Sequence, residues 1–358
     1  MSKYLFVVHS SITLRMARAI IRENGWKRDN CIFLSDRGFQ TGENDVKVLD
    51  ITPFFIRPIR WQERKKFRSI CRTNKKLLLE LYFLIQSEVA DSFQLFIPHS
   101  RPYAYMAMIR HPNCTQYAFV EEGMLSYRTD FYNYVHSASF IKRIVLKGVI
   151  NYCLGSGFQA FPESLLYQHL KYAGCYGINK STFPTLPDEN KHIVPPPFEH
   201  QEEYASIKHL LVAGPWIEKG YCSIAEYKQL KRALFKYWTS KGIDVLHVKF
   251  HPRQYHEQVS IALFMELAGE FADRIKVIEL PPEASPEEIA FSSQADFYLA
   301  HSSSTIYASQ FGCRVFSYAK TIWKYWPASR VYVDHLPPVI TENMISLDLP
   351  IEDSTDQK

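Results

Sequence analysis

The sequence of 358 residues lacks the short motifs that mark several common enzyme chemistries. It contains no Gly-x-x-x-x-Gly-Lys-Ser/Thr loop and no Gly-x-Gly-x-x-Gly fingerprint, which argues against a P-loop protein and a dinucleotide-dependent enzyme. The Gly-x-Ser-x-Gly elbow of esterases is absent too. No Asp-x-Asp motif is present, so nothing indicates a site that binds a nucleotide sugar through a metal ion.

Cysteines and long apolar runs are also scarce. The seven cysteines are scattered and include no Cys-x-x-Cys pair, which indicates reduced thiols rather than a disulfide framework or a zinc ribbon. No run approaches the ~20 apolar residues that a membrane span needs. We therefore expect a cytoplasmic protein, either soluble or bound peripherally at the inner face of the cytoplasmic membrane.

Basic residues are concentrated in one segment. The net charge is +5, but residues 60–76 hold eight basic side chains against one acidic side chain. Such a patch indicates an anionic partner, a membrane surface or an acidic glycan, although a solvated helix face remains an alternative. A nucleic-acid partner is not expected, because basic and aromatic residues are not interleaved more widely. Four arginines recur every four residues and would form one stripe on a helix: Arg60, Arg64, Arg68 and Arg72.

The hydrophobic pattern alternates between strand-like and helix-like segments in two halves. With 46% hydrophobic residues, the chain can bury sizeable cores. Five prolines fall within 184–197, where regular structure is hard to continue. We predict two α/β domains with parallel sheets, residues 1–183 and 198–340, joined by a linker at 184–197 and followed by a polar tail at 341–358. The expected strands are 4–8, 31–34, 46–50, 95–97, 116–120, 209–213, 244–250, 275–280, 296–300 and 314–318.

Three polar motifs follow expected strands, the positions where open α/β sheets bind ligands. The first is Glu121-Glu122-Gly123, directly after the strand at 116–120. Repulsion between adjacent carboxylates can raise one pKa toward the range of a general base, and the glycine permits a tight turn. An ordinary exposed turn is the alternative.

The second motif is His251-Pro252-Arg253, after the strand at 244–250. A histidine held at a strand end by the following proline can meet a phosphate as imidazolium, with Lys249 and Arg253 adding positive charge. A structural histidine without chemistry remains possible. A metal site is the further alternative, and its ligands would be His247, His251 and His256.

The third motif is the hydroxyl run Ser302-Ser303-Ser304-Thr305 after His301, between a strand and a helix. Hydroxyl groups and unpaired backbone N–H groups at a helix N-terminus together form an anion site. The alternative is a plain helix cap, which needs only one of these residues.

The order of these motifs resembles that of the bacterial sialyltransferases, which include lipooligosaccharide sialyltransferases and capsular polysialyltransferases. Those enzymes share acid-acid-Gly, then His-Pro, then a serine run, with the linker between the first two. The sequence Leu-Leu-Val-Ala-Gly-Pro at 210–215, followed by Glu218-Lys219-Gly220, is similar to the opening of their donor-binding domain. The resemblance implies the GT-B architecture, two Rossmann-type domains that face each other across a cleft.

The same resemblance implies a function: metal-independent, cofactor-free and inverting transfer of sialic acid from CMP-sialic acid to a glycan acceptor, lipooligosaccharide or capsular polysaccharide. Glu121 or Glu122 would be the general base and His251 would contact the donor phosphate. Ser302 and Ser303 would bind the same phosphate, although Ser304 leaves the register ambiguous by one residue. Glu279 would hold the ribose, with Glu283 as its competitor. The expected substrate-binding residues also include Gly123, Gly214, Pro215 and Pro252.

Other functions remain open from the sequence. Another GT-B glycosyltransferase, or a CDP-glycerol-type phosphotransferase, could use comparable strand-end motifs on a different nucleotide. A non-enzymatic polyanion-binding protein would instead use the basic segment together with Trp61 and Phe67. The acceptor, the linkage, the number of sugars added and the oligomeric state have no signal in the sequence.

Overall fold

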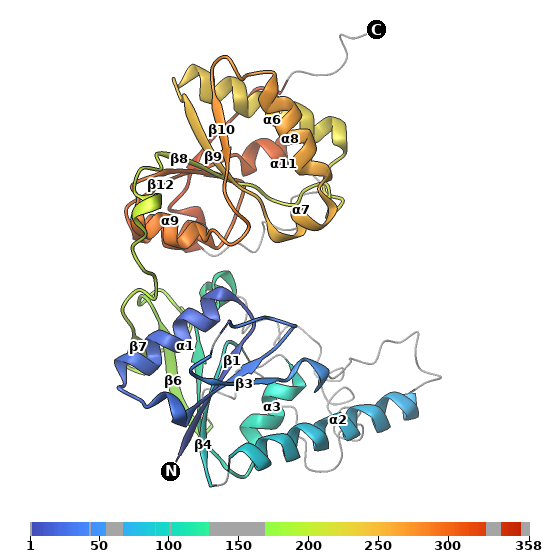
Figure 1. Cartoon of the computed structure of the whole chain (residues 1–358), viewed down its shortest axis with the longest axis vertical. Helices are drawn as coiled ribbons and strands as arrows, with labels where there is room; N and C mark the ends of the chain where they lie inside the picture. Colours follow the sequence, from blue (N-terminus) through green and yellow to red (C-terminus); the bar gives the residue numbers. More distant parts are fainter. Residues whose placement is uncertain are drawn as a thin grey trace. The chain divides into compact units, whose positions relative to one another are not determined.

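The computed structural model describes residues 2–42, 44–54, 67–89, 91–99, 102–128, 169–326 and 338–351. The chain divides into two compact units, Met1–Pro197 and Phe198–Lys358. Each unit contains one parallel sheet with helices packed on it (Figure 1). The predicted fold class, two Rossmann-type α/β units, is confirmed.

The first unit contains a seven-stranded sheet in the order β3-β2-β1-β4-β5-β6-β7. The chain order reverses between β1 and β4, which creates the switch point where open α/β sheets place their ligands. β2 is buried along its whole length, as expected of a parallel strand covered on both faces. The strands are β1 (Lys3–Val8), β2 (Cys31–Ser35), β3 (Lys47–Asp50), β4 (Phe93–Ile97), β5 (Cys114–Val120), β6 (Tyr172–Gly177) and β7 (Lys191–Ile193).

Three α-helices of the first unit lie in its described part. Helix α1 (Ser11–Glu23) is capped by Ser10, whose side chain accepts a hydrogen bond from the Thr13 amide, and α1 packs against β1. Helix α2 (Phe67–Glu88) packs against α3 (Tyr103–Arg110). Short 3₁₀ segments occur at η1 (Arg28–Asn30), η2 (Thr52–Phe54), η4 (Met124–Tyr127) and η6 (Asp188–Asn190).

The second unit contains a six-stranded sheet in the order β10-β9-β8-β11-β12-β13, with its switch point between β8 and β11. Its strands are β8 (His209–Val212), β9 (Val245–Lys249), β10 (Lys276–Glu279), β11 (Asp296–Leu299), β12 (Arg314–Ser317) and β13 (Ile345–Ser346). Its helical segments are η7 (Glu202–Tyr204), α6 (Ile224–Ser240), α7 (Pro252–Glu257), α8 (Val259–Gly269), α9 (Pro286–Ser292), α10 (Ser304–Gln310), α11 (Ala319–Tyr325) and α12 (Pro338–Thr341).

Two segments expected to be irregular carry strands instead. The proline-rich stretch 184–197 contains β7, which pairs with β6 at the edge of the first sheet. The strand fits because Pro187 and Pro195 lie outside it and an edge strand needs fewer ladder donors. The expected polar tail begins with β13, paired with β12, and then buries Leu347 and Leu349 in the core. Residues 352–358 lie outside the described residues.

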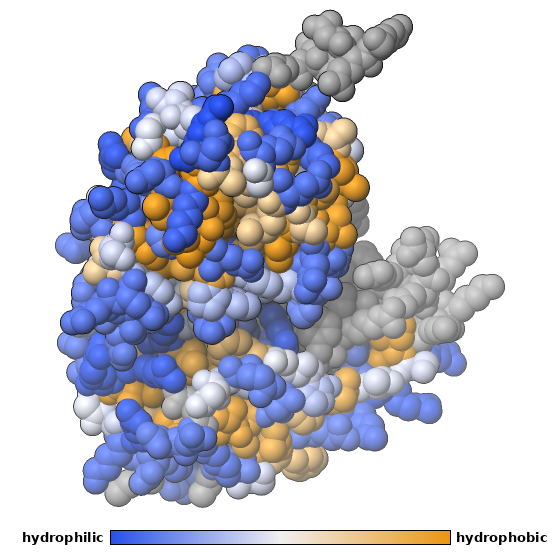
Figure 2. Space-filling model, turned by 45° about the horizontal axis from the view of Figure 1, so that its top comes forward, coloured by the Kyte–Doolittle hydropathy of each residue, from blue (hydrophilic) through white to orange (hydrophobic). Residues whose placement is uncertain are grey.

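The described surface carries hydrophobic groups among hydrophilic ones (Figure 2). Across the ranges that the structure describes, no helix combines the length and the hydropathy needed to cross a membrane. Arg60 and Arg64 of the expected basic stripe lie outside these ranges, whereas Arg68 and Arg72 are exposed on α2.

Candidate functional site

The first unit gathers polar residues at the carboxyl ends of three neighbouring strands. His9 follows β1, His99 follows β4, and Glu121 and Glu122 follow β5. These strands are consecutive in the sheet and include its switch point. Residues from distant parts of the sequence therefore meet at one edge of the first sheet.

Glu122 lies between two imidazoles. Its Oε2 atom is 3.1 Å from His9 Nε2 and 3.8 Å from His99 Nε2, and the three side chains are almost fully buried. Burial raises the pKa of Glu122, but the hydrogen bond from His9 and the nearby His99, His9 and Arg37 outweigh it, so the net pKa is lowered. The expected increase from carboxylate repulsion is therefore wrong for Glu122. The other oxygen, Oε1, is buried and has no hydrogen-bond partner among the described residues.

Glu121 occupies a different environment. Its side chain is 0% exposed. Oε1 accepts a hydrogen bond from the Tyr127 hydroxyl at 2.8 Å, and Oε2 accepts from the Ile178 amide at 2.9 Å and the Thr182 hydroxyl at 3.2 Å. Glu121 thus ties the end of β5 to the chain that follows β6. This geometry favours Glu122 over Glu121 for acid–base chemistry.

Gly123 makes the turn directly after the two carboxylates. Its φ of 102° and ψ of −140° lie in a region that glycine adopts far more readily than other residues. The turn leads into η4, so that the Ser126 hydroxyl accepts a hydrogen bond from the Glu122 amide at 3.0 Å. It also brings Tyr127 to Glu121.

A second layer of polar residues surrounds His99. The Arg37 guanidinium lies 3.3 Å from His99 Nε2, and the Arg37 amide donates to Asp36 Oδ1 at 2.8 Å. The hydroxyl of buried Tyr105, on α3, donates a short hydrogen bond to Asp36 Oδ2. His9, His99, Asp36 and Arg37 were not among the predicted site residues. Their position just after strands marks them as possible ligand-binding residues, but only the strand order shows that they lie beside Glu122.

In the second unit, Gly214 and Ser302 follow β8 and β11, the two strands of the switch point, and His251 follows β9, which pairs with β8. Gly214 has a packing reason. A Cβ atom there would lie 2.8 Å from Trp216 Nε1. Trp216 is buried and makes an edge-to-face contact with His301 at 5.6 Å between ring centroids. The adjacent Pro215 carbonyl accepts a hydrogen bond from the Lys219 amide at 3.1 Å.

His251 caps helix α7. Its Nδ1 accepts a hydrogen bond from the Arg253 amide at 3.1 Å, and Pro252 occupies the first helical turn. Burial lowers the His251 pKa, as do the positive charges of Lys219, Lys249 and Arg253. The ring is therefore mainly neutral at neutral pH, with its hydrogen on Nε2. The expected imidazolium is therefore disfavoured in the free protein, and the neutral ring can donate a hydrogen bond from Nε2.

A buried hydrogen-bond chain holds His251 in place. Gln254 Oε1 accepts from the His251 amide at 2.8 Å, and Gln254 Nε2 donates to Ser260 Oγ at 2.7 Å. The Ser260 hydroxyl in turn donates to Glu218 Oε1. Glu218, part of the motif at 218–220, is thus linked to the His251 backbone through Ser260 and Gln254.

The serine run divides by role. Ser304 is buried, and its hydroxyl donates to Glu287 Oε1 at 2.9 Å. Ser302 Oγ accepts from the Ser304 amide at 3.2 Å, whereas the Ser303 side chain makes no capping hydrogen bond. Ser302 and Ser303 are half-buried. The register therefore favours Ser302 and Ser303 over Ser304 for contact with a ligand.

The last predicted residue, Glu279, is exposed at the end of β10. Near it, buried Lys249 donates from Nζ to the Phe250 carbonyl at 2.9 Å. Burial lowers the pKa of Lys249 despite the opposing charges of Glu283, Glu287 and Glu279. Glu279 and Glu283 therefore both remain candidates for a hydroxyl-binding carboxylate.

The metal alternative gains no support from the geometry. Among the residues that the structure describes, no three His, Cys, Asp or Glu side chains form a group that could hold a metal ion. His247, His251 and His256 are all described and do not form such a cluster.

Comparisons with known proteins give structural similarity only. No protein-family model and no curated protein matches the sequence. The chain is similar to UDP-GlcNAc 2-epimerase from Neisseria meningitidis bound to UDP-GlcNAc, at 9% identity and a TM-score of 0.47 over 96% of this chain and 97% of that one. It is similar to S. aureus MnaA in a UDP co-structure, at 11% identity and a TM-score of 0.46 over 96% and 92%. It is also similar to Acinetobacter baumannii MurG, at 10% identity and a TM-score of 0.42 over 97% and 86%. Similarities of this size assign no chemistry to the chain.

Proposed function

We propose that the protein is an inverting, metal-independent sialyltransferase that moves sialic acid from CMP-sialic acid to a glycan acceptor. The observation that carries the proposal is the Glu122 carboxylate, recessed between His9 and His99 at the switch point of the first sheet. The order of the three motifs supports the same family of reactions. The nearly buried carboxylate is ionised at neutral pH, so it can accept a proton without help from a metal ion.

Glu122 acts as the general base on the acceptor hydroxyl. Its Oε1 atom has a free lone pair among the described groups, while Oε2 is held by His9. Proton removal as the hydroxyl attacks the sugar typically accelerates such a step by about 10²–10⁴-fold. The hydrogen bond from His9 orients the carboxylate and stabilises its charged form.

The second unit stabilises the leaving group. Cytidine monophosphate departs with charge on a single phosphate, which His251 Nε2–H and the hydroxyls of Ser302 and Ser303 bind as neutral donors. Fixed donors directed at developing charge are an effective substitute for a divalent ion. Glu279 or Glu283 holds the ribose hydroxyls in this scheme.

The acceptor is an anionic glycan of the lipooligosaccharide or capsular type, presented at the inner face of the cytoplasmic membrane. The exposed Arg68 and Arg72 of α2 support attachment to an anionic surface. Arg60 and Arg64 extend the same basic segment in the sequence.

A donor screen tests the proposal. Purified protein is incubated with CMP-sialic acid, with UDP-, GDP- and CDP-activated sugars and with CDP-glycerol, and nucleotide release is measured by chromatography. We expect cytidine monophosphate release from CMP-sialic acid and from no other donor, undiminished by EDTA. When a glycan acceptor is present, Glu122→Gln should lower this release about 10²–10⁴-fold. Turnover of another donor would identify a different nucleotide-dependent transferase. The proposed site would allow this, because its donors contact the phosphate and do not distinguish one nucleobase from another. Inactivity with every donor would favour a binding protein.

A further inference from the structure

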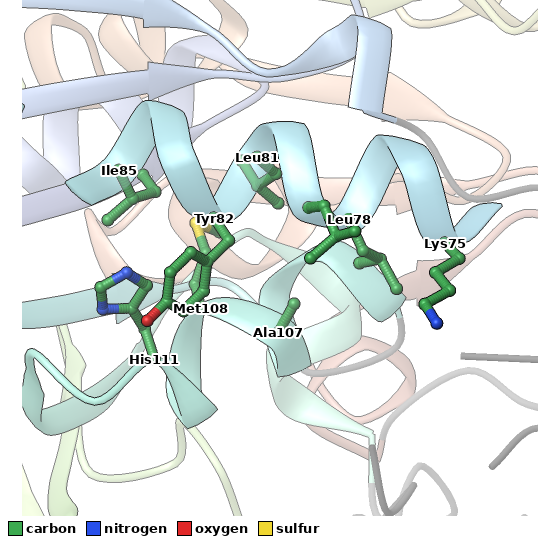
Figure 3. A pocket seen from close by; sticks show the side chains of 9 residues that line it. Lys75, Leu78, Leu81, Tyr82, Ile85, Ala107, Met108 and His111 are labelled. Carbon is green, nitrogen blue, oxygen red and sulfur yellow. The ribbon is translucent and has the colours of Figure 1, made fainter. Parts of the chain in front are cut away.

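A pocket in the first unit lies between α2 and α3, outside the Glu122 site. Its volume is about 120 Å³, close to the ~150 Å³ of an engineered apolar cavity that binds benzene. Figure 3 shows the side chains of α2 directed toward α3 across this space. The lining residues are Lys75, Leu78, Leu79, Leu81, Tyr82, Ile85, Ala107, Met108 and His111.

The lining is mainly hydrocarbon, with polar groups contributed by Lys75, Tyr82 and His111. The Nδ1 atom of His111 accepts a hydrogen bond from the Asn113 amide at 3.1 Å, so the neutral ring carries its hydrogen on Nε2. Nε2 is buried, His111 is only 2% exposed, and the ring also interacts with the Tyr82 backbone. The Tyr82 ring packs on the same imidazole at 4.3 Å between ring centroids (Figure 3). The pocket therefore suits an apolar group.

The exposed face of α2 beside the pocket is amphipathic along the helix axis. Side chains spaced three or four residues apart share one face of a helix. In the first half of α2 this face is basic, with Glu80 forming an ion pair to Lys76 at 3.6 Å. In the second half it exposes Leu79 by 48% and Phe83 by 63%. The exposed basic residues are Arg68, Arg72, Lys75 and Lys76.

We propose that the pocket between α2 and α3 binds the hydrocarbon chain of an anionic membrane lipid, while the basic half of α2 contacts lipid headgroups. A soluble anionic glycan would match the charge but leave Leu79, Phe83 and the pocket without a partner. A neutral apolar ligand would fill the pocket but make no use of the cations. An anionic amphiphile satisfies both. The inference rests on the proposed attachment to an anionic membrane and not on sugar transfer.

Methionine-methyl NMR tests the pocket directly, because Met108 lines it. The full chain is labelled at methionine methyl groups, the Met108 signal is assigned with Met108→Leu, and dihexanoylphosphatidylglycerol is added below its micellar concentration. We expect a saturable shift of the Met108 signal. Inorganic phosphate should leave the signal in place, and dihexanoylphosphatidylcholine should bind about fivefold or more weakly, since one favourable charge near an anionic group has about that effect.

A pocket-filling variant supplies the control. Ala107→Leu adds hydrocarbon inside the pocket, whereas Ala262→Leu makes the same change at an exposed position of α8. The first should abolish the shift that the short-chain lipid causes at Met108, and the second should preserve it. Circular dichroism and thermal unfolding confirm that both variants fold.

Vesicle sedimentation separates this inference from the proposed attachment. Parent protein, Leu79→Gln/Phe83→Gln and Ala107→Leu are mixed with phosphatidylcholine vesicles with and without phosphatidylglycerol. Anionic vesicles that bind the parent while Met108 never responds to short-chain lipid would overturn the pocket but keep the attachment. A Met108 response that persists in Ala107→Leu would overturn it too. A specific response without vesicle binding would keep the pocket and remove the attachment.

Discussion

The paired carboxylates offer the sharpest test, because Glu121→Gln and Glu122→Gln make the same chemical change at adjacent residues. Glu121 accepts three hydrogen bonds in a fully buried site. An amide keeps only one acceptor oxygen, so at least one charge-assisted hydrogen bond is lost, which costs about 1.5–3 kcal/mol. In a unit of this size, each kcal/mol of lost stability lowers the melting temperature by about 2–4 °C, so the melting temperature of Glu121→Gln should fall by roughly 3–12 °C.

Glu122→Gln should lose activity more than stability. The glutamine amide can still accept a hydrogen bond from His9, so the unfolding temperature should fall by less than that of Glu121→Gln, although the stabilising charge is lost. Transfer should fall about 10²–10⁴-fold, because the proton acceptor is gone. Circular dichroism melting and steady-state transfer to acceptor, measured on both variants and the parent, separate the two roles. A stable but inactive Glu121→Gln beside an active Glu122→Gln would refute the assignment.

The pH profile adds a second check. The Glu122 pKa in the folded protein lies below its ordinary value. The ionised carboxylate therefore stabilises the fold at any pH above its unfolded-state pKa. This stabilisation is lost as the pH falls through the folded-state pKa. The acid limb of transfer should therefore lie below the ordinary glutamate range. A limb at neutral pH would contradict Glu122 as the base.

Three further variants test the second unit. His251→Ala should lower turnover about 10²–10³-fold with the fold intact, measured by steady-state kinetics, and full turnover would remove His251 from the mechanism. Gly214→Ala should lower the melting temperature because its Cβ meets Trp216, whereas Gly269→Ala, with open space, should not; equal melting would refute the steric argument. Lys231 is 0% exposed, has no hydrogen-bond partner in the described structure, and burial lowers its pKa to about 8 from 10.5. Between pH 8 and 10.5 the unfolded chain therefore binds more protons than the folded chain, so the free energy of unfolding rises with pH in this range. Lys231→Met should abolish this rise, and an unchanged rise in the variant would contradict the explanation.

Much of the fold follows from local patterns. β2 and β11 are buried along their whole length, so their apolar runs identify them, and the cap at Ser223 identifies the start of α6. β6 was missed because two glycines interrupt its sequence, and β13 because it has two residues. Both strands form because they pair with a neighbouring strand of the sheet, and such pairing leaves no pattern in the local sequence.

The candidate site divides in the same way. The motifs around Glu122, His251 and Ser302 are visible because each places polar groups directly after an apolar strand. His9 and His99 each follow a strand too, but a lone histidine after a strand is a weak signal. Their contact with Glu122 depends on β1, β4 and β5 being neighbours in the sheet, although β1 and β4 are far apart in the sequence.

Local patterns in the sequence predict the two α/β halves, most of their strands and the polar motifs at strand ends, because burial periodicity and capping act over a few residues. The environment of each motif residue, by contrast, depends on the tertiary structure. It buries Glu121 among three donors and leaves one oxygen of Glu122 without a partner among the described residues. It also lowers the pKa of His251 through burial and the charges of three nearby cations. Desolvation and charge proximity depend on which strands become neighbours, and the spacing of residues along the chain does not encode that.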